Sequence, residues 1–378
     1  MTSKVRLFAA LVVMALAALA CGTPATPPAV ATQQPPTSSP ELPLVEAPQI
    51  LQFYMANENA GWGTTETKVV RTYDGGVTWY DVTPPGLEVV AYSPYVFRDS
   101  QTAWLLIPGP DPLGEGTLYR TADGGLTWNS ASTPFGFASL QFLDSINGFA
   151  MADLGAGAGS QAVAIYQTLD GGATWRRNYL NDPTVAGAGD SLPLGGQKYG
   201  VTFRDSMHGW VGGSIPMEGV IYLYATQDGG QTWAEQKLAM PAGFENAFTG
   251  ADAPLFFSAA EGVLPVGLAT DISARVFYRT TDGGATWTAG QPAALYGWYD
   301  IVSPLDFFIW NGAPLLSVTH DGGMTWSEIT PNVDLSALLT AFQFVNSNVG
   351  WALASHDGAD TTLYKTSDGG VTWTVLVP

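Results

Sequence analysis

The side chains that most often catalyse reactions or ligate metals are few in this sequence, and they are not spaced for either task. The histidines are His208, His320 and His356, and none stands at the His-Glu-x-x-His spacing of a zinc site. The one cysteine, Cys21, excludes a thiolate metal cluster and an intramolecular disulfide. There is no nucleophile elbow of the Gly-x-Ser-x-Gly type and no phosphate-binding loop. We therefore predict no metal, no cofactor and no catalytic residue.

Carboxylates are the exception, because glycoside hydrolysis needs only two of them at a suitable separation. The chain has 33 acidic residues, and the sequence does not give the distance between any two of them. A glycoside hydrolase therefore remains an alternative. The same acids produce a formal net charge of −19, which repels phosphate backbones and excludes nucleic acid as a partner.

The composition indicates a turn-rich β protein. Hydrophobic residues make up 46% of the chain and charged residues only 12%, so large cores can form. The 44 glycines and 26 prolines have no collagen-like period and instead indicate many turns.

The N-terminus has the features of an export signal. Two basic residues precede a 13-residue apolar run at positions 7–19, which is typical of a signal peptide. The following Ala18-Leu19-Ala20-Cys21 resembles a bacterial lipobox, in which the cysteine becomes the lipidated first residue. An ordinary cleavage site that leaves Cys21 as a free thiol is the alternative. We predict a signal peptide at residues 1–20 and an extracytoplasmic protein whose acylated Cys21 anchors it to the cell membrane.

Residues 21–49 are predicted to be a linker without a core. Eight prolines lie between positions 22 and 49, mixed with small and polar residues. Pro-rich chain is extended at about 3.1 Å per residue, so this segment would hold the next domain away from the bilayer.

Residues 50–378 contain seven copies of one octapeptide, Thr-x-Asp-Gly-Gly-x-Thr-Trp. Its aspartates are Asp74, Asp123, Asp170, Asp228, Asp282, Asp321 and Asp368. They stand 39 to 58 residues apart, which is the length of a propeller blade. The Asp-Gly-Gly sequence suits a tight hairpin, because glycine adopts positive φ and the carboxylate accepts backbone N–H groups. We predict that these aspartates stabilise turns and take no part in ligand chemistry.

A looser element precedes each octapeptide and has the form aromatic-x-Asp/Asn, three residues, Gly-aromatic. It is clear at residues 97–104, 142–149, 203–210 and 344–351, weaker at 55–62, and degenerate at 257–263 and 307–310. Each unit also contains short runs with β character, four in the second unit. These features predict an all-β fold, a seven-bladed β-propeller of four-stranded antiparallel blades. Blade seven is expected to close the ring by packing on blade one, without an exchanged C-terminal strand.

The octapeptide is identified as the Asp box, or bacterial neuraminidase repeat, which occurs in sialidases, sortilins, xyloglucanases and the photosystem II assembly and stability factor. Seven blades that carry both elements most resemble the last of these families. That resemblance implies the propeller fold and a role in assembling a membrane complex. Sialidases also use an arginine triad and an Arg-Ile-Pro motif, and the latter is absent from this sequence.

Antiparallel strand order places the connections of each blade on two opposite faces. Turns between first and second strands and between third and fourth strands share the Asp-box face, named for the seven octapeptides. Loops between second and third strands and between blades share the other, variable-loop face. These loops differ in length, as at residues 108–116, 176–199 and 234–254. Variable loops on a rigid scaffold are where binding is usually tailored.

The candidate partner-binding residues are aromatic side chains of the variable-loop face. They are Phe244, Phe248, Tyr296, Trp298 and Tyr299. Trp298 is the first choice, because eleven of the thirteen tryptophans occupy the two repeat elements and Trp298 lies outside both. The same face carries acids such as Asp252 and Asp300. A purely structural role, plugging the central channel, is the alternative for any of these aromatic residues.

These observations predict a non-enzymatic, monomeric binding protein of the cell envelope. Its partner would be a protein or a glycan, as for an assembly factor of a membrane complex. The alternative is a secreted glycoside hydrolase of the sialidase or xyloglucanase type.

Overall fold

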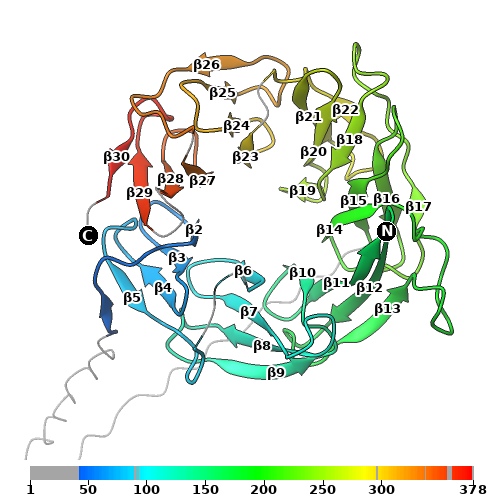
Figure 1. Ribbon diagram of the computed structural model, residues 1–378, viewed down its shortest axis with the longest axis horizontal. Coiled ribbons are helices and arrows are strands. Elements are labelled where there is room, and N and C mark those ends of the chain that lie inside the picture. Colours follow the sequence, from blue (N-terminus) through cyan, green and yellow to red (C-terminus); the bar gives the residue numbers. More distant parts are fainter. Residues whose placement is uncertain are drawn as a thin grey trace, which may run out of the picture. The chain divides into compact units, whose positions relative to one another are not determined.

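The computed structural model describes residues 42–88, 91, 93–294, 297–336, 338–355 and 360–376, and Figure 1 shows their strands. These residues belong to one compact unit that extends from Leu42 to Pro378. The unit is a ring of seven antiparallel sheets, which confirms the predicted seven-bladed propeller. Cys21 lies outside the described residues. Among the residues described there is no helix with the length and apolarity needed to cross a membrane.

Each blade contains one Asp box, and its inner strand, which is β2 in blade one and the first strand in the other blades, faces the centre of the ring (Figure 1). Blade one consists of β1 (Leu44–Val45), β2 (Gln52–Met55), β3 (Gly61–Thr64), β4 (Val69–Thr72) and β5 (Trp79–Asp81). Blade two consists of β6 (Tyr95–Phe97), β7 (Ala103–Pro108), β8 (Gly116–Thr121) and β9 (Asn129–Thr133). Blade three consists of β10 (Ala138–Phe142), β11 (Gly148–Gly157), β12 (Ser160–Thr168) and β13 (Arg176–Leu180). Blade four consists of β14 (Gln197–Phe203), β15 (Gly209–Ser214), β16 (Tyr222–Thr226) and β17 (Ala234–Glu235).

The remaining three blades complete the ring. Blade five consists of β18 (Phe248–Ala251), β19 (Leu255–Phe256), β20 (Gly262–Ala269), β21 (Ser273–Thr280) and β22 (Thr288–Ala289). Blade six consists of β23 (Trp298–Ile301), β24 (Phe307–Trp310), β25 (Leu316–Thr319) and β26 (Ser327–Ile329). Blade seven consists of β27 (Leu339–Phe344), β28 (Gly350–Ser355), β29 (Thr361–Thr366) and β30 (Thr374–Val375).

The ring closes by packing of blade seven on blade one, as predicted. The last strand, β30, pairs with β29 in its own blade and is not exchanged. Several side chains of blade seven bond to blade one, among them Trp351 and Gln343. The Trp351 indole N–H donates to the Gly75 carbonyl at 2.8 Å. The Gln343 amide accepts from the Met55 N–H at 2.7 Å and donates to the Met55 carbonyl at 3.1 Å.

Blades one and five depart from the predicted four strands. In blade one, Leu44 and Val45 pair with Tyr80 and Trp79, so β1 adds a strand outside β5. The predicted linker, 21–49, is therefore too long at its C-terminal end. The physical reason is that Leu42 and Val45 are apolar and pack against buried clusters. In blade five the inner edge is divided into β18 and β19, which both pair with β20.

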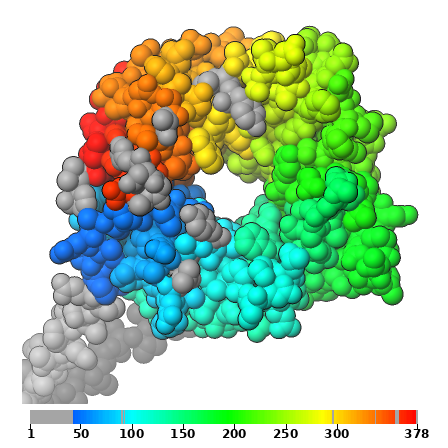
Figure 2. All heavy atoms as spheres, in the orientation of Figure 1, coloured from blue at the N-terminus to red at the C-terminus, as the bar shows by residue number. Residues whose placement is uncertain are grey.

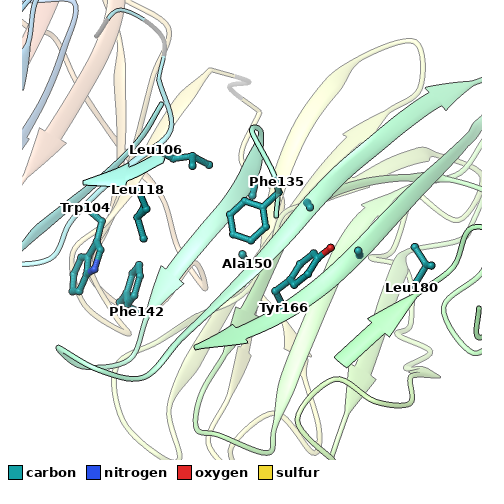
Figure 3. Close-up of a cluster of buried hydrophobic side chains, with 11 residues drawn as sticks. Trp104, Leu106, Leu118, Phe135, Phe142, Ala150, Tyr166 and Leu180 are labelled. Carbon is teal, nitrogen blue, oxygen red and sulfur yellow. The ribbon is translucent and has the colours of Figure 1, made fainter. Parts of the chain in front are cut away.

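The hydrophobic core is divided among the seams between neighbouring blades. Figure 3 shows the cluster between blades two and three, where Trp104 of β7 faces Phe142 of β10. Their rings stack with centroids 3.7 Å apart, and the Trp104 indole N–H donates to the Gly171 carbonyl at 2.9 Å. Aromatic stacking plus burial of the whole indole fixes the spacing of the two blades. The repeated tryptophans thus serve packing.

The looser repeat element is the turn between the first two strands, and it is present in all seven blades. In blade three the Asp144 carboxylate accepts the N–H groups of Ile146 and Asn147, both at 2.7 Å. The degenerate copies keep the turn with serine. Ser258 and Ser303 accept equivalent N–H groups in blades five and six. The aromatic position in blade five is Phe256, which pairs with Gly262, one residue earlier than predicted.

Candidate functional site

Two hollows open on the variable-loop face, beside the inner strands of blades four to seven. The first hollow, about 620 Å³, lies between blades four and five and is lined by Tyr199, Ser214 and Phe248 among others. The second hollow, about 770 Å³, is lined by residues of blades five, six and seven, including Trp298 and Tyr299. Figure 2 shows the opening at the centre of the ring that the inner strands surround.

Asp252 and Arg275 line both hollows and connect them. The Arg275 Nη1 atom lies 3.1 Å from Asp252 Oδ2, and its guanidinium carbon lies 4.3 Å from the centroid of the Tyr299 ring. The Tyr299 hydroxyl donates to the same Oδ2 atom at 2.9 Å. Burial, followed by the Asp252 charge, raises the pKa of Tyr299, so this hydroxyl keeps its proton. Arg275 is 6% exposed, whereas the Asp252 side chain is 37% exposed.

The alternation of side chains along β23 explains how this short strand contacts both neighbouring blades, five and seven. Successive side chains of a strand point to opposite sides. Tyr299 and Ile301 pack with the cluster that contains Phe277. Asp300 points the other way and accepts the N–H of Phe344 in blade seven. Trp298, the first residue of the strand, pairs in register with Trp310 and remains 54% exposed.

The structure brings three of the five predicted aromatic residues to the two hollows. Phe248 lines the first hollow and is 48% exposed, and Trp298 and Tyr299 line the second. Phe244 is partly buried against the blade-five core and does not line either hollow. A role of Phe244 in partner binding stays a prediction. Tyr296 lies outside the described residues.

Arg275 is the site residue that the sequence analysis missed. It lies near the start of β21, in the run Ser-Ala-Arg-Val-Phe-Tyr-Arg-Thr. A charged side chain at the loop end of a strand, directly before the apolar run Val276-Phe277-Tyr278, is the signal that could have identified it. Asp252 was noted only as one acid of the face.

Asp300 is the second carboxylate in the second hollow, and both of its oxygens are bonded to backbone. Oδ1 accepts the Ile301 N–H at 3.0 Å, and Oδ2 accepts the Phe344 N–H. Desolvation on burial outweighs these two bonds and raises the pKa of Asp300 to about 6. An acid with such a pKa exchanges its proton near neutral pH.

The seven Asp boxes lie at the opposite ends of the blades and share one bonding pattern. In blade one, Asp74 Oδ1 accepts the Thr78 N–H at 2.9 Å, and Oδ2 accepts the Thr78 hydroxyl at 2.6 Å. The Thr72 hydroxyl donates to Oδ1 at 2.9 Å and accepts the Gly76 N–H at 2.8 Å. The equivalent aspartates have the same Thr partner two residues earlier and the same N–H partner four residues later. These carboxylates are used by their own turns.

Histidine and carboxylate side chains form pairs in this structure. His208 Nδ1 lies 2.9 Å from Asp205, and His320 Nδ1 lies 2.7 Å from Asp306. Within the described residues there is no group of three or more His, Cys, Asp or Glu that could hold a metal ion. His356 lies outside these residues.

Comparison with solved structures shows what the chain is similar to in fold. A structure of YCF48 bound to D1 peptide has a TM-score of 0.54 at 16% identity, covering 86% of this chain and 93% of that one. A GH74 xyloglucanase from Xanthomonas campestris has a TM-score of 0.55 at 14% identity, covering 89% of this chain and 55% of that one. A PL25 ulvan lyase has a TM-score of 0.51 at 12% identity, covering 88% and 94%. No protein-family model and no curated protein sequence matches the chain.

These similarities establish the shared propeller fold and do not select a function. The similar structures include enzymes that act on polysaccharides and a protein with a bound peptide. One scaffold that carries such different activities gives no information about the activity of another member. The function has to be argued from the residues of the site.

Proposed function

We propose that this chain is a non-enzymatic binding protein of the cell envelope that holds a protein or a glycan on its variable-loop face. The observation that carries the proposal is the exposure of three large aromatic side chains at the hollows, Phe248 at 48%, Tyr199 at 52% and Trp298 at 54%. Exposed aromatic residues on a rigid scaffold are frequent anchors of binding surfaces. The peptide bound to YCF48, a protein of similar fold, is compatible with such a role.

The absence of catalysis is proposed from the bonding of the two carboxylates in the second hollow. Asp252 is held by Arg275 and Tyr299, and Asp300 is held by two backbone N–H groups. Asp300 also occupies the strand position of Gln141 in blade three and Gln343 in blade seven, each of which bonds to the next blade. A structural role in joining blades six and seven is therefore enough to explain why Asp300 is buried and bonded at this position, and no catalytic role is needed.

The location in the envelope is part of the same proposal. It rests on the signal-peptide and lipobox features of residues 1–21. Acyl chains on Cys21 would keep the propeller at a membrane surface. The propeller would then present its variable-loop face to a neighbouring molecule of the envelope.

The test compares ligand retention by the wild-type protein and the double variant Phe248→Ala/Trp298→Ala. Both proteins are used to capture partners from a solubilised envelope fraction and to probe a glycan array. Truncation of a binding hot spot costs about 2 kcal/mol or more, so retention of a true ligand should fall about 30-fold or more. Leu169→Ala is the matched control, because Leu169 is 65% exposed and lies on the Asp-box face. Equal loss in control and double variant would contradict the proposal.

A glycoside hydrolase is the second candidate, and one observation favours it. Asp252 and Asp300 line the same hollow, and the pKa of Asp300 is raised to about 6, as for a general acid. Purified protein should be incubated with sialosides, xyloglucan and other β-glucans. Hydrolysis that is abolished by Asp300→Asn and by Asp252→Asn would replace the binding proposal with this one.

A further inference from the structure

The described basic residues are concentrated at the Asp-box face. Eight of the twelve lie beside an Asp box or in a first-to-second-strand turn, where several donate to backbone carbonyls of a neighbouring blade. Arg71 donates to Gly124, Arg204 to Gly283 and Lys365 to Glu58. The residues at this face are Arg71, Arg98, Arg120, Arg176, Arg177, Arg204, Arg279 and Lys365.

The basic side chains at the variable-loop face are mostly paired within the protein. Lys68 lies 2.6 Å from Asp81, and Arg275 is bonded to Asp252. The Lys198 ammonium is buried among four backbone carbonyls at 2.9 to 3.2 Å. Lys237 is the exception, but it follows β17 at the rim of blade four and lies 3.9 Å from Glu235.

Carboxylates in the loops of this face lack such basic partners. Six of them form no ion pair with a described Lys or Arg, namely Glu66, Glu88, Asp111, Glu218, Asp271 and Asp334. A face with this excess of negative charge attracts cations over a Debye length, about 8–10 Å at physiological salt, and repels acidic polymers.

Arg275 demonstrates how the site holds a guanidinium group. Its charge is paired with Asp252 Oδ2, and its guanidinium carbon lies over the Tyr299 ring, 4.3 Å from the centroid. Carboxylate plus aromatic face is a favourable environment for a cation. Asp252 Oδ1 has no bonding partner among the described residues, and the side chain is 37% exposed where the two hollows meet. Exposed aromatic rings line the same hollows as Asp252, with Phe248 and Tyr199 in the first hollow and Trp298 in the second.

We propose that the ligand of the variable-loop face is a basic polypeptide segment, with an Arg or Lys side chain bound at Asp252 between Phe248 and Trp298. This inference rests on the proposed function and specifies the chemistry of its partner. The ligand cation pairs with Asp252 Oδ1 and lies against an exposed aromatic ring. The surrounding carboxylates attract the rest of the segment and accelerate its association. A neutral glycan would gain nothing from these charges.

The experiment measures binding of a fluorescent peptide of alternating Arg and Gly to the full chain, and of the matched Glu and Gly peptide. We expect the Arg peptide to bind and the Glu peptide not to bind, with affinity falling as salt increases. Asp252→Asn should weaken binding about 10-fold or more, and Trp298→Ala to a similar degree. Glu88→Gln removes the same charge from a loop between blades one and two and should change affinity less than about twofold. Thermal unfolding confirms that each variant is folded.

The outcomes separate this inference from the proposed function. A xyloglucan oligosaccharide is tested in the same assay as a neutral probe. If it binds through Trp298 while the Arg peptide does not bind, the basic partner is wrong and the binding face stands. Equal weakening of Arg-peptide binding by Glu88→Gln and Asp252→Asn would mean that the negative charge of the whole face attracts the peptide and that Asp252 forms no specific site. This result would also overturn the inference. If Trp298→Ala changes the binding of neither probe, both proposals fail.

Discussion

The Asp300 carboxylate accepts a hydrogen bond from the backbone N–H of Phe344, at a joint where two other blades use glutamine. In blade three, Gln141 accepts the Phe203 N–H at 2.6 Å and donates to the Phe203 carbonyl at 3.0 Å. An ionised aspartate can only accept, so blade six lacks the second bond. A protonated Asp300 has a donor and resembles the amide. Burial raises the pKa of Asp300 to about 6, although its two backbone hydrogen bonds act in the opposite direction.

Asp300→Asn should therefore stabilise the protein near neutral pH. The pKa of Asp300 in the folded protein, about 6, is above the unfolded value of about 4, so the folded state binds more protons between these pH values. Stability from Asp300 is complete below pH of about 4 and is lost as the pH rises through about 6. The variant should gain roughly 2–3 kcal/mol at pH 7 and nothing at pH 4. Urea unfolding across this range measures the difference.

The control for this prediction is Asp271→Asn, which removes an exposed carboxylate of the same face. As an exposed surface substitution it should change the free energy of unfolding at pH 7 by less than about 0.5 kcal/mol. If Asp300→Asn has the same pH profile as the wild type, Asp300 does not titrate in this range and its proposed protonation is wrong.

The fold could be predicted from sequence because each Asp box is a local structure. Thr72, Asp74 and Thr78 bond within one turn, so seven copies of the pattern indicate seven turns wherever the strands lie. The turns of blades five and six give only degenerate copies of the looser element, because Ser258 and Ser303 replace the expected Asp or Asn. Their hydroxyls accept the same N–H groups, but serine is too common to be a signal.

The site was less accessible to sequence analysis because it joins separate strands. Trp298 and Phe248 could be selected as aromatic residues next to loops of unequal length. The pairing of Arg275 with Asp252, 23 residues away, depends on the register of β18, β20 and β21. The contact of Tyr299 with Asp252 crosses from blade six to blade five. Such contacts follow from the closure of the ring and have no local pattern.

Asp228→Ala should destabilise the propeller without affecting ligand binding. Asp228 accepts the N–H groups of Gln231 and Thr232, both at 2.9 Å, and the Thr232 hydroxyl at 2.6 Å. Leaving these donors unpaired in a half-buried turn costs about 1–3 kcal/mol, towards the lower end because solvent reaches the turn. Thermal unfolding measures the loss, and Gln227→Ala, an exposed neighbour, is the control. Loss of ligand binding with unchanged stability would assign Asp228 to the site instead.

The effect of Asp228→Ala should also depend on pH. Partial burial alone would raise the pKa of Asp228, but hydrogen bonds from Thr232 and Thr226 lower it overall. A carboxyl with a lowered pKa stabilises the fold above its unfolded value of about 4 and loses this effect as the pH falls further. The difference in unfolding free energy between wild type and variant should therefore shrink in acid.

Cys21→Ala should release the protein from membranes. The wild-type chain is expected in the membrane fraction, because a lipidated N-terminal cysteine with more than one acyl chain binds a bilayer stably. Without the cysteine, lipidation has no acceptor and the propeller should appear in the soluble extracytoplasmic fraction. Immunoblots of separated fractions measure this. If the variant remains with the membrane to the same extent, Cys21 is not the anchor and an ordinary cleavage site is the better interpretation.

Lys198→Met should loosen the loop that leads from blade three to blade four. The Lys198 ammonium donates to the carbonyls of Leu194, Gly195 and Gly196 in this loop and to the carbonyl of Gln161 in β12. This buried charge therefore holds the loop against blade three. Methionine fills the space but leaves these carbonyls without their donor, at a cost of about 2–4 kcal/mol. We expect a lower melting temperature and faster proteolysis within residues 181–196. Lys237→Met, in which an 83% exposed side chain is changed, should alter neither measurement. Equal behaviour of the two variants would show that the carbonyls find other donors and that Lys198 does not hold the loop.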